Sequence, residues 1–224
     1  RPIHFATELF YPPFQIKIPV LQKLYYDLSL TPAAYHGADF APPGPPRFHS
    51  RRGLNSQSLA LFLPDRLVIV EEWVDIAFEQ FLNKVREVAR RTFDAFELSA
   101  YVAQTVTLRT VFALSNVPDA RAFMLENICG LKEDILSVFG RPIGVGGMRF
   151  VFPPTPEKPE EVHLLVESFR HNVREVFVEV QTFLANVELS GRSLDTIIEN
   201  IVKARRFIDE RVRCFLEPYD RKPA

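Results

Sequence analysis

The sequence predicts an α+β fold in which a curved, mainly antiparallel sheet carries long helices on one face. From Glu161 to Leu216 the chain shows two strand-like runs and then a long amphipathic helical pattern. A shorter version of the same order runs from Ser58 to Phe96. Hydrophobic residues make up 47% and charged residues 25% of the 224 positions, which is typical of a globular domain with a sizeable core. We therefore expect a single domain over residues 1–224.

The first half is marked by proline and by changes in apolar period. Pro19 suits the first turn of a helix, and the stretch 31–57 is dense in proline and glycine, which predicts a loop. Pro64-Asp65 separates two apolar runs and predicts a hairpin. The predicted elements are a strand over 3–18, a helix over 20–28, a short edge strand near 38–40, paired strands over 58–63 and 66–71, and a helix over 74–96.

The second half begins with a long strand rich in Val, Thr and Phe. Pro118 predicts a helix start, Gly130 an interruption and Gly140 the end of that helix. Ser193 is the expected N-cap of the last helix. The predicted elements are a strand over 100–114, a helix to 139, a strand over 143–152, paired strands over 162–169 and 173–184, and a helix from 194 to about 215.

The two halves share this order, which indicates an internal duplication. Each half, 1–97 and 98–217, is interpreted as a β-α-β-β-β-α unit, and residues 218–224 as a frayed tail. Two such units would form one curved sheet with long helices across one face. This arrangement resembles the saddle or helix-grip architectures.

Three features also carry a family resemblance: the turn Pro64-Asp65-Arg66-Leu67, the long helix that precedes a long strand, and Ser193-Leu194-Asp195 at the entry to the last helix. With these features the chain resembles a sporadically distributed, functionally uncharacterised bacterial family. Its long strand has Leu108-Arg109-Thr110 where that family has Tyr-x-Asn. The resemblance implies a bacterial origin and no assigned activity.

Charge and composition favour some classes of partner over others. The chain has 27 Lys and Arg against 28 Asp and Glu, a near-neutral balance that argues against a dedicated nucleic-acid binder and permits self-association. Cys129 and Cys214 fall on apolar helical positions and are expected to be reduced core thiols. No apolar run is long enough for a membrane span, and the start lacks a signal pattern, so we expect a cytoplasmic protein.

Chemical motifs are weak. None of the five histidines has a metal-ligating spacing, and no serine or cysteine lies in a catalytic elbow. Gly144-Val145-Gly146-Gly147 precedes a strand rather than a helix, which indicates a bent strand rather than a phosphate loop. We therefore expect no catalytic residue, metal or cofactor.

The leading hypothesis is a non-enzymatic protein that works by association, as a homo-oligomer or as a subunit of a larger assembly. In the strand 173–184, Val176, Val178 and Val180 point one way, toward the helices. The opposite side carries the candidate partner-binding residues, which are Glu175, Phe177, Glu179 and Phe183.

Two alternatives remain open. A basic cluster in the predicted loop could bind an anion or nucleic acid through Arg47, His49, Arg51 and Arg52. A cavity between sheet and helices could hold a small ligand or an active site through Tyr101, Thr107 and Arg109.

Overall fold

A computed structural model describes residues 1–185 and 194–220 of the chain. Within this part, nine strands form one sheet. The strands are β1 (Pro2–Phe10), β2 (Gly37–Asp39), β3 (Arg47–Arg52), β4 (Ser56–Leu63), β5 (Arg66–Glu72), β6 (Ala103–Ala113), β7 (Gly147–Phe152), β8 (Glu161–Ser168) and β9 (Glu175–Leu184).

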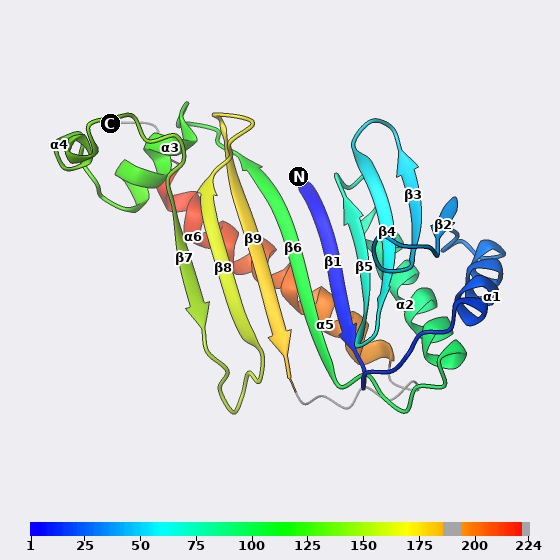
Figure 1. The fold of residues 1–224 in the computed structure, drawn as a ribbon. Helices are drawn as coiled ribbons and strands as arrows, with labels where there is room; N and C mark the ends of the chain where they lie inside the picture. The colour runs from blue at the N-terminus through cyan, green and yellow to red at the C-terminus, as the bar shows by residue number, and fades with distance from the viewer. Residues whose placement is uncertain (186–193, 221–224) are drawn as a thin grey trace.

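All neighbouring strands pair antiparallel, in the order β2-β3-β4-β5-β1-β6-β9-β8-β7 (Figure 1). The predicted α+β class with a large antiparallel sheet is thus confirmed. The order is mirrored about the β1–β6 pair, because β5, β4 and β3 follow β1 on one side as β9, β8 and β7 follow β6 on the other.

The helical segments are α1 (Ile18–Ser29), α2 (Phe78–Ala95), α3 (Ala120–Ala122), a π-helical segment (Phe123–Ile128), α4 (Glu133–Leu136), a 3-10 turn (Ser137–Phe139), α5 (Leu194–Arg206), a second π-helical segment (Phe207–Val212), α6 (Arg213–Leu216) and a 3-10 turn (Glu217–Tyr219). Figure 1 shows α2 and α5 crossing behind the sheet. The helix α2 packs on β1 and β5, and α5 packs on β6 and β9.

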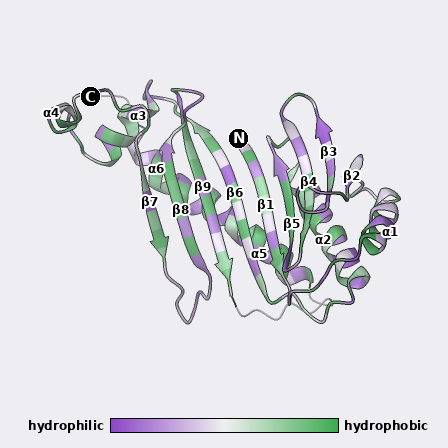
Figure 2. Ribbon diagram, viewed as in Figure 1, coloured by the Kyte–Doolittle hydropathy of each residue, from purple (hydrophilic) through white to green (hydrophobic). Residues whose placement is uncertain are grey.

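The core lies between these helices and the sheet. Side chains alternate along the strands, as the colour bands in Figure 2 show, and the apolar set faces the helices. Val176, Val178 and Val180 are fully buried on this side. The large phenylalanines Phe62 and Phe81 are buried with them. Removal of this apolar surface from water drives the packing of α2 and α5 on the sheet.

The prediction of a loop over residues 47–52 is wrong, because these residues form β3. Phe48 and Ser50 are buried, whereas Arg47, His49 and Arg51 point to the other side. This period of two fits a strand, and pairing with β4 satisfies its backbone. The surrounding prolines concealed the pattern.

The helix starts differ from the predictions by a few residues. The helix α2 begins at Phe78 rather than at 74. At this observed start, the backbone N–H of Ala77 donates to Gln80 Oε1 at 2.8 Å. Asp119 caps α3 by accepting from the backbone N–H of Arg121 at 2.7 Å, so a helix does start near the predicted Pro118. Gly130 and Gly140 both have positive φ, which explains why the helical path is interrupted at these two positions.

The end of the chain is held at one point. The carboxylate of Asp220 accepts from the backbone N–H groups of Ser115 at 2.7 Å and Asn116 at 2.9 Å. Of the expected frayed tail, residues 218–220 are therefore anchored and 221–224 lie outside the described residues, as does the expected N-cap Ser193. Cys129 is half-buried and Cys214 is exposed, so the expectation of two core thiols is wrong.

Candidate interaction face

The face of the sheet opposite α2 and α5 is called the open face below, because no described helix lies over it in Figure 1. Strand register sets its side chains in rows that run across the sheet. One row, read from β4 to β7, consists of Gln57, Glu72, His4, Arg109, Glu179, Leu165 and Arg149. The next row consists of Leu59, Val70, Ala6, Thr107, Gln181, His163 and Val151. The open face is therefore mixed in chemistry rather than apolar.

The structure places all four predicted partner-binding residues on the open face, where each is half-buried. Glu179 Oε2 accepts from Arg109 Nε at 2.6 Å, and the Glu175 carboxylate lies 3.5 Å from the Arg1 guanidinium. The Phe183 ring lies 4.9 Å from the His163 ring. These side chains already have neighbours in the sheet, so the face is ordered before anything binds to it.

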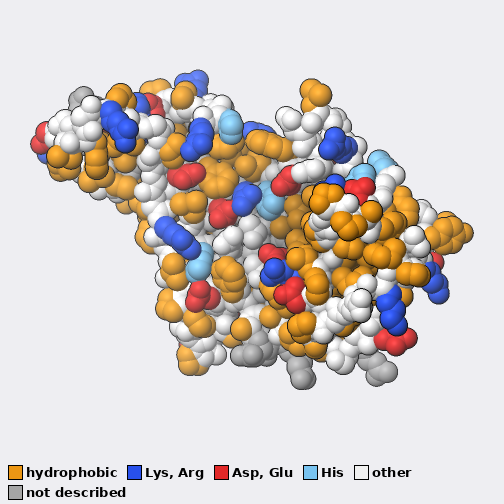
Figure 3. Space-filling view, in the orientation of Figure 1, with side chains coloured by type: hydrophobic (Ala, Val, Ile, Leu, Met, Phe, Trp, Pro, Cys, Tyr) orange, Lys and Arg blue, Asp and Glu red, His pale blue; other side chains and the backbone are white. Residues whose placement is uncertain are grey.

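Other charges of the open face are also paired within it. The Arg66 guanidinium lies 3.5 Å from the Glu8 carboxylate. His163 lies between Glu161, at 2.6 Å, and Arg149, at 3.0 Å. Figure 3 shows basic and acidic side chains interspersed with apolar ones and no large field of one sign. Such a face does not favour a polyanion, which binds to concentrated positive charge.

An aromatic cluster occupies the end of the open face where β5 and β8 finish. It consists of Trp73, Phe169, His171 and Phe177. The Phe169 and Phe177 rings stack at 6.2 Å, and His171 meets Phe169 at 5.3 Å and Trp73 at 6.5 Å. In the sheet, β1 and β6 separate β5 from β9, so Trp73 and His171 meet across two intervening strands.

Trp73 is the only tryptophan of the chain and is held in an unusual conformation. Its φ is 47°, in the left-handed region that a bulky residue rarely adopts, and its backbone N–H donates to Ile3 O at 2.8 Å. The residue as a whole remains 42% exposed. Sequence reasoning found Phe177 but missed Trp73, Phe169 and His171. The single Trp directly after a strand was the available signal.

His4 lies in the first row, between Glu72 on β5 and Arg109 on β6. Burial, and after it the positive charge of Arg109, lowers the pKa of His4 from its usual 6.5 to about 4. At neutral pH the His4 ring is therefore uncharged.

The predicted basic cluster is divided between the two faces of β3. Arg47 Nε donates to Asp39 at 2.7 Å, and His49 lies 3.7 Å from the same carboxylate. Arg52 points to the other side and pairs with Asp75 at 3.3 Å. Of these four residues, Arg51 alone has no ion-pair partner among the described residues. The four residues thus do not converge on one anion site.

The predicted ligand trio is not brought together either. Tyr101 is buried beneath α2, and its hydroxyl donates to Ala89 O at 2.7 Å. Thr107 and Arg109 lie on the open face, on the other side of the sheet. The reason is an irregularity before β6, since Tyr101 and Gln104 both face the helices although they are three positions apart, an odd spacing that would put them on opposite faces of a regular strand.

A buried polar network that no local sequence pattern predicts lies under α2. Lys84 Nζ donates to Glu71 Oε1 at 2.6 Å and to Ser58 Oγ at 2.7 Å, and Ser58 Oγ donates to the same Glu71 oxygen at 2.6 Å. Burial lowers the pKa of Lys84, and the Glu71 charge opposes that shift. Ser58 is only 1% exposed and its proton is directed at a carboxylate, so the Ser–Lys pair is closed to a substrate.

The described residues contain no group of three or more His, Cys, Asp or Glu side chains that could hold a metal ion. At Gly147 an added Cβ would lie 2.6 Å from the carbonyl oxygen of Val166, so this glycine permits close strand pairing. The glycine-rich stretch therefore has a packing role at the start of β7.

Comparison with known proteins gave no family model, no curated protein and no solved structure that matches this chain. Among the described residues, no helix has both the length and the apolar character that crossing a membrane requires.

Proposed function

We propose that this protein works by association rather than by catalysis, and that a second copy of the chain docks on the open face. The observation that carries the proposal is the partial exposure and unusual backbone conformation of Trp73. Trp73 is partly exposed on a strained backbone directly after β5, and its ring meets His171 at one end of an aromatic cluster that continues through Phe169 to Phe177 on β9. Backbone strain persists where the surrounding structure enforces it, often at functional positions, and tryptophan is enriched among the residues that dominate interface energies.

Charge also supports self-association. Arg109 with Glu179, and Arg66 with Glu8, are ion pairs within the open face, so a partner could cover these side chains without leaving their charges unpaired. The formal net charge of −1 gives little repulsion between two copies. Nucleic-acid binding has weaker support, because Arg47 and Arg52 are already paired with acids.

We further propose that the halves 1–97 and 98–217 are two copies of one unit, joined into a single saddle-like domain. The mirrored strand order supports this proposal, as does the equivalent packing of α2 on β1 and β5 and of α5 on β6 and β9. A duplicated unit gives the open face an approximate internal symmetry, which suits docking against a copy of itself.

Sedimentation velocity over a range of concentrations tests the proposal. The wild-type chain should form a dimer, and Trp73→Ala should raise the dimer Kd by about tenfold or more, as expected for an interface hot spot. Tyr26→Ala removes an exposed aromatic from α1, away from the open face, and serves as the matched control that should leave the Kd unchanged.

A wild-type chain that remains monomeric throughout the micromolar range contradicts self-association. A dimer that Trp73→Ala does not weaken would place the contact elsewhere on the molecule. Circular dichroism of each variant establishes that a loss of dimer does not come from unfolding.

A further inference from the structure

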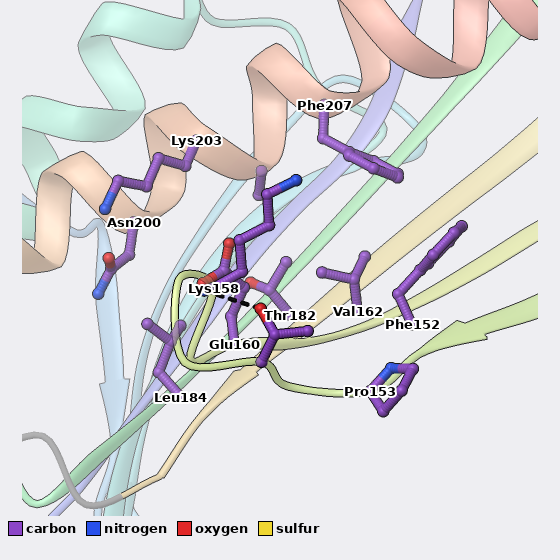
Figure 4. A pocket seen from close by; sticks show the side chains of 12 residues that line it. Phe152, Pro153, Lys158, Glu160, Val162, Thr182, Leu184, Asn200, Lys203 and Phe207 are labelled. Atoms are coloured by element: carbon purple, nitrogen blue, oxygen red, sulfur yellow. Dashed lines mark hydrogen bonds between the residues drawn. The ribbon is translucent and has the colours of Figure 1, made fainter.

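A cleft lies on the helix-covered side of the sheet, between α5 and the ends of β7, β8 and β9 (Figure 4). Its volume is about 390 Å³, which falls within the range of small-molecule sites. Most of its wall is apolar and comes from Phe152, Val162, Leu184 and Phe207. The cleft is on the opposite side of the sheet from the open face.

One hydroxyl in the wall of the cleft has no partner. Thr182 is only 5% exposed, and its Oγ1 makes no hydrogen bond within the described part of the chain. Its cross-strand neighbours are Val106 and Val162, so packing alone would be served equally by valine. In contrast Asn200, which also lines the cleft, donates its amide to Gln104 Oε1 at 2.9 Å. A buried hydroxyl without a partner is costly, which makes Thr182 a candidate contact for a polar ligand atom.

The cleft also carries a positive charge. Lys158 and Lys203 line it, and neither ammonium has an ion-pair partner among the described residues. Glu160 is the one carboxylate in the wall, so two positive charges and one negative charge leave one net positive charge. The backbone N–H of Lys158 donates to Thr155 Oγ1 at 3.1 Å, the dashed line in Figure 4, and this turn holds Lys158 opposite α5.

From these observations we infer that the cleft binds a small molecule with an apolar body and one carboxylate. The apolar body would lie against Phe152 on β7 and Phe207, the residue that follows α5, whose rings contact each other at a centroid distance of 5.7 Å and together form one wall of the cleft. The carboxylate would accept from the Thr182 hydroxyl or lie near Lys158 or Lys203, whose side chains extend in different directions in Figure 4. A neutral molecule of the same shape would leave the lysines without a counter-charge and would bind more weakly.

Isothermal titration of the full chain with decanoate, and with decanol as the uncharged analogue, tests this inference. Decanoate should bind at one site per chain, and decanol about tenfold more weakly. Stronger binding of decanol than of decanoate, or no heat from decanoate up to its solubility limit, would overturn the inference.

Two variants locate the site. Thr182→Val keeps the shape of the wall and should weaken decanoate about three- to tenfold through the lost hydrogen bond. The double variant Lys158→Met/Lys203→Met should weaken decanoate by a similar factor and leave decanol unchanged. Lys132→Met, at an exposed lysine outside the cleft, is the matched control and should change neither ligand.

Decanoate binding that all of these variants leave unchanged would mean adsorption elsewhere and would also overturn the inference. The lysine variants change exposed side chains and are expected to fold, so the test does not depend on Thr182→Val alone. Because the readout is a ligand Kd, it is independent of the oligomeric state, and failure of the dimer proposal would leave this result in place.

Discussion

Two ion pairs of equal length lie on opposite faces of the sheet. The Lys84–Glu71 pair beneath α2 and the Arg109–Glu179 pair on the open face both have an N–O distance of 2.6 Å. The side chains of the first pair are 6% and 2% exposed, and those of the second are 38% and 19% exposed. The two ion pairs therefore have the same length, but one is buried in the core and the other is partly exposed to water.

The difference shows how each face handles polar groups. Under α2, the Lys84–Glu71 pair is completed by Ser58, so every charge of the network is neutralised inside the core. On the open face, the Arg109–Glu179 pair is still hydrated, and Trp73 at the end of the face remains partly exposed. The helix-covered face encloses its polar groups in the core, whereas the open face keeps them in contact with water.

Removal of one member of the buried pair should have the largest effect on stability. Lys84→Met leaves the Glu71 charge buried without its partner, and the free energy of unfolding should fall by about 3–5 kcal/mol. Urea unfolding measures this change, provided that the slope of the transition is unchanged.

The double variant Glu71→Gln/Lys84→Met is the control for that measurement. It removes both charges and keeps an amide that can bond Ser58, so it should be more stable than Lys84→Met alone. A loss below about 1 kcal/mol for Lys84→Met would mean that water reaches this network, and the contrast between the two faces would disappear.

His4 provides an intermediate effect that depends on pH. Its pKa is about 4 in the folded chain against the usual 6.5, so the unfolded chain binds the proton more readily. The stability contributed by neutral His4 is present above pH 6.5 and is lost as the pH falls from 6.5 toward 4. We expect the loss between pH 7.5 and pH 4.5 to be about 2 kcal/mol larger in the wild type than in His4→Gln.

Urea unfolding of both chains at the two pH values provides this comparison, because the other titrating groups are common to them. The same substitution at the exposed His36 is the matched control and should retain the wild-type pH dependence. Equal losses in the wild type and in His4→Gln would show that the first row of the open face is better hydrated than its burial indicates.

Local pattern was sufficient for some of these features. The alternation within β9 alone placed Glu175, Phe177, Glu179 and Phe183 on one face, because a strand has a period of two regardless of its neighbours. The apolar stripe likewise predicted the buried side of α5.

Other features depend on contacts between segments that sequence does not join. Trp73 meets His171 only because the sheet order leaves just two strands, β1 and β6, between β5 and β9. The partnership of Lys84 with Glu71 requires α2 to fold back over β5, and a lysine within an amphipathic helix gives no local signal of burial. Proline density concealed β3, since a strand between proline-rich segments has the composition of a loop.

The Arg109–Glu179 pair should give the smallest effect, and its size also reports on the proposed dimer. A double-mutant cycle with Arg109→Met and Glu179→Gln should yield a coupling energy of about 0.2–1 kcal/mol in the dilute monomer, because both side chains are hydrated. If a second copy covers the open face, the same cycle at concentrations that favour the dimer should give a larger coupling, because the pair then loses water. A coupling that is small at both concentrations would place any dimer contact away from this row, whereas one that is already several kcal/mol in the monomer would make the two faces equivalent.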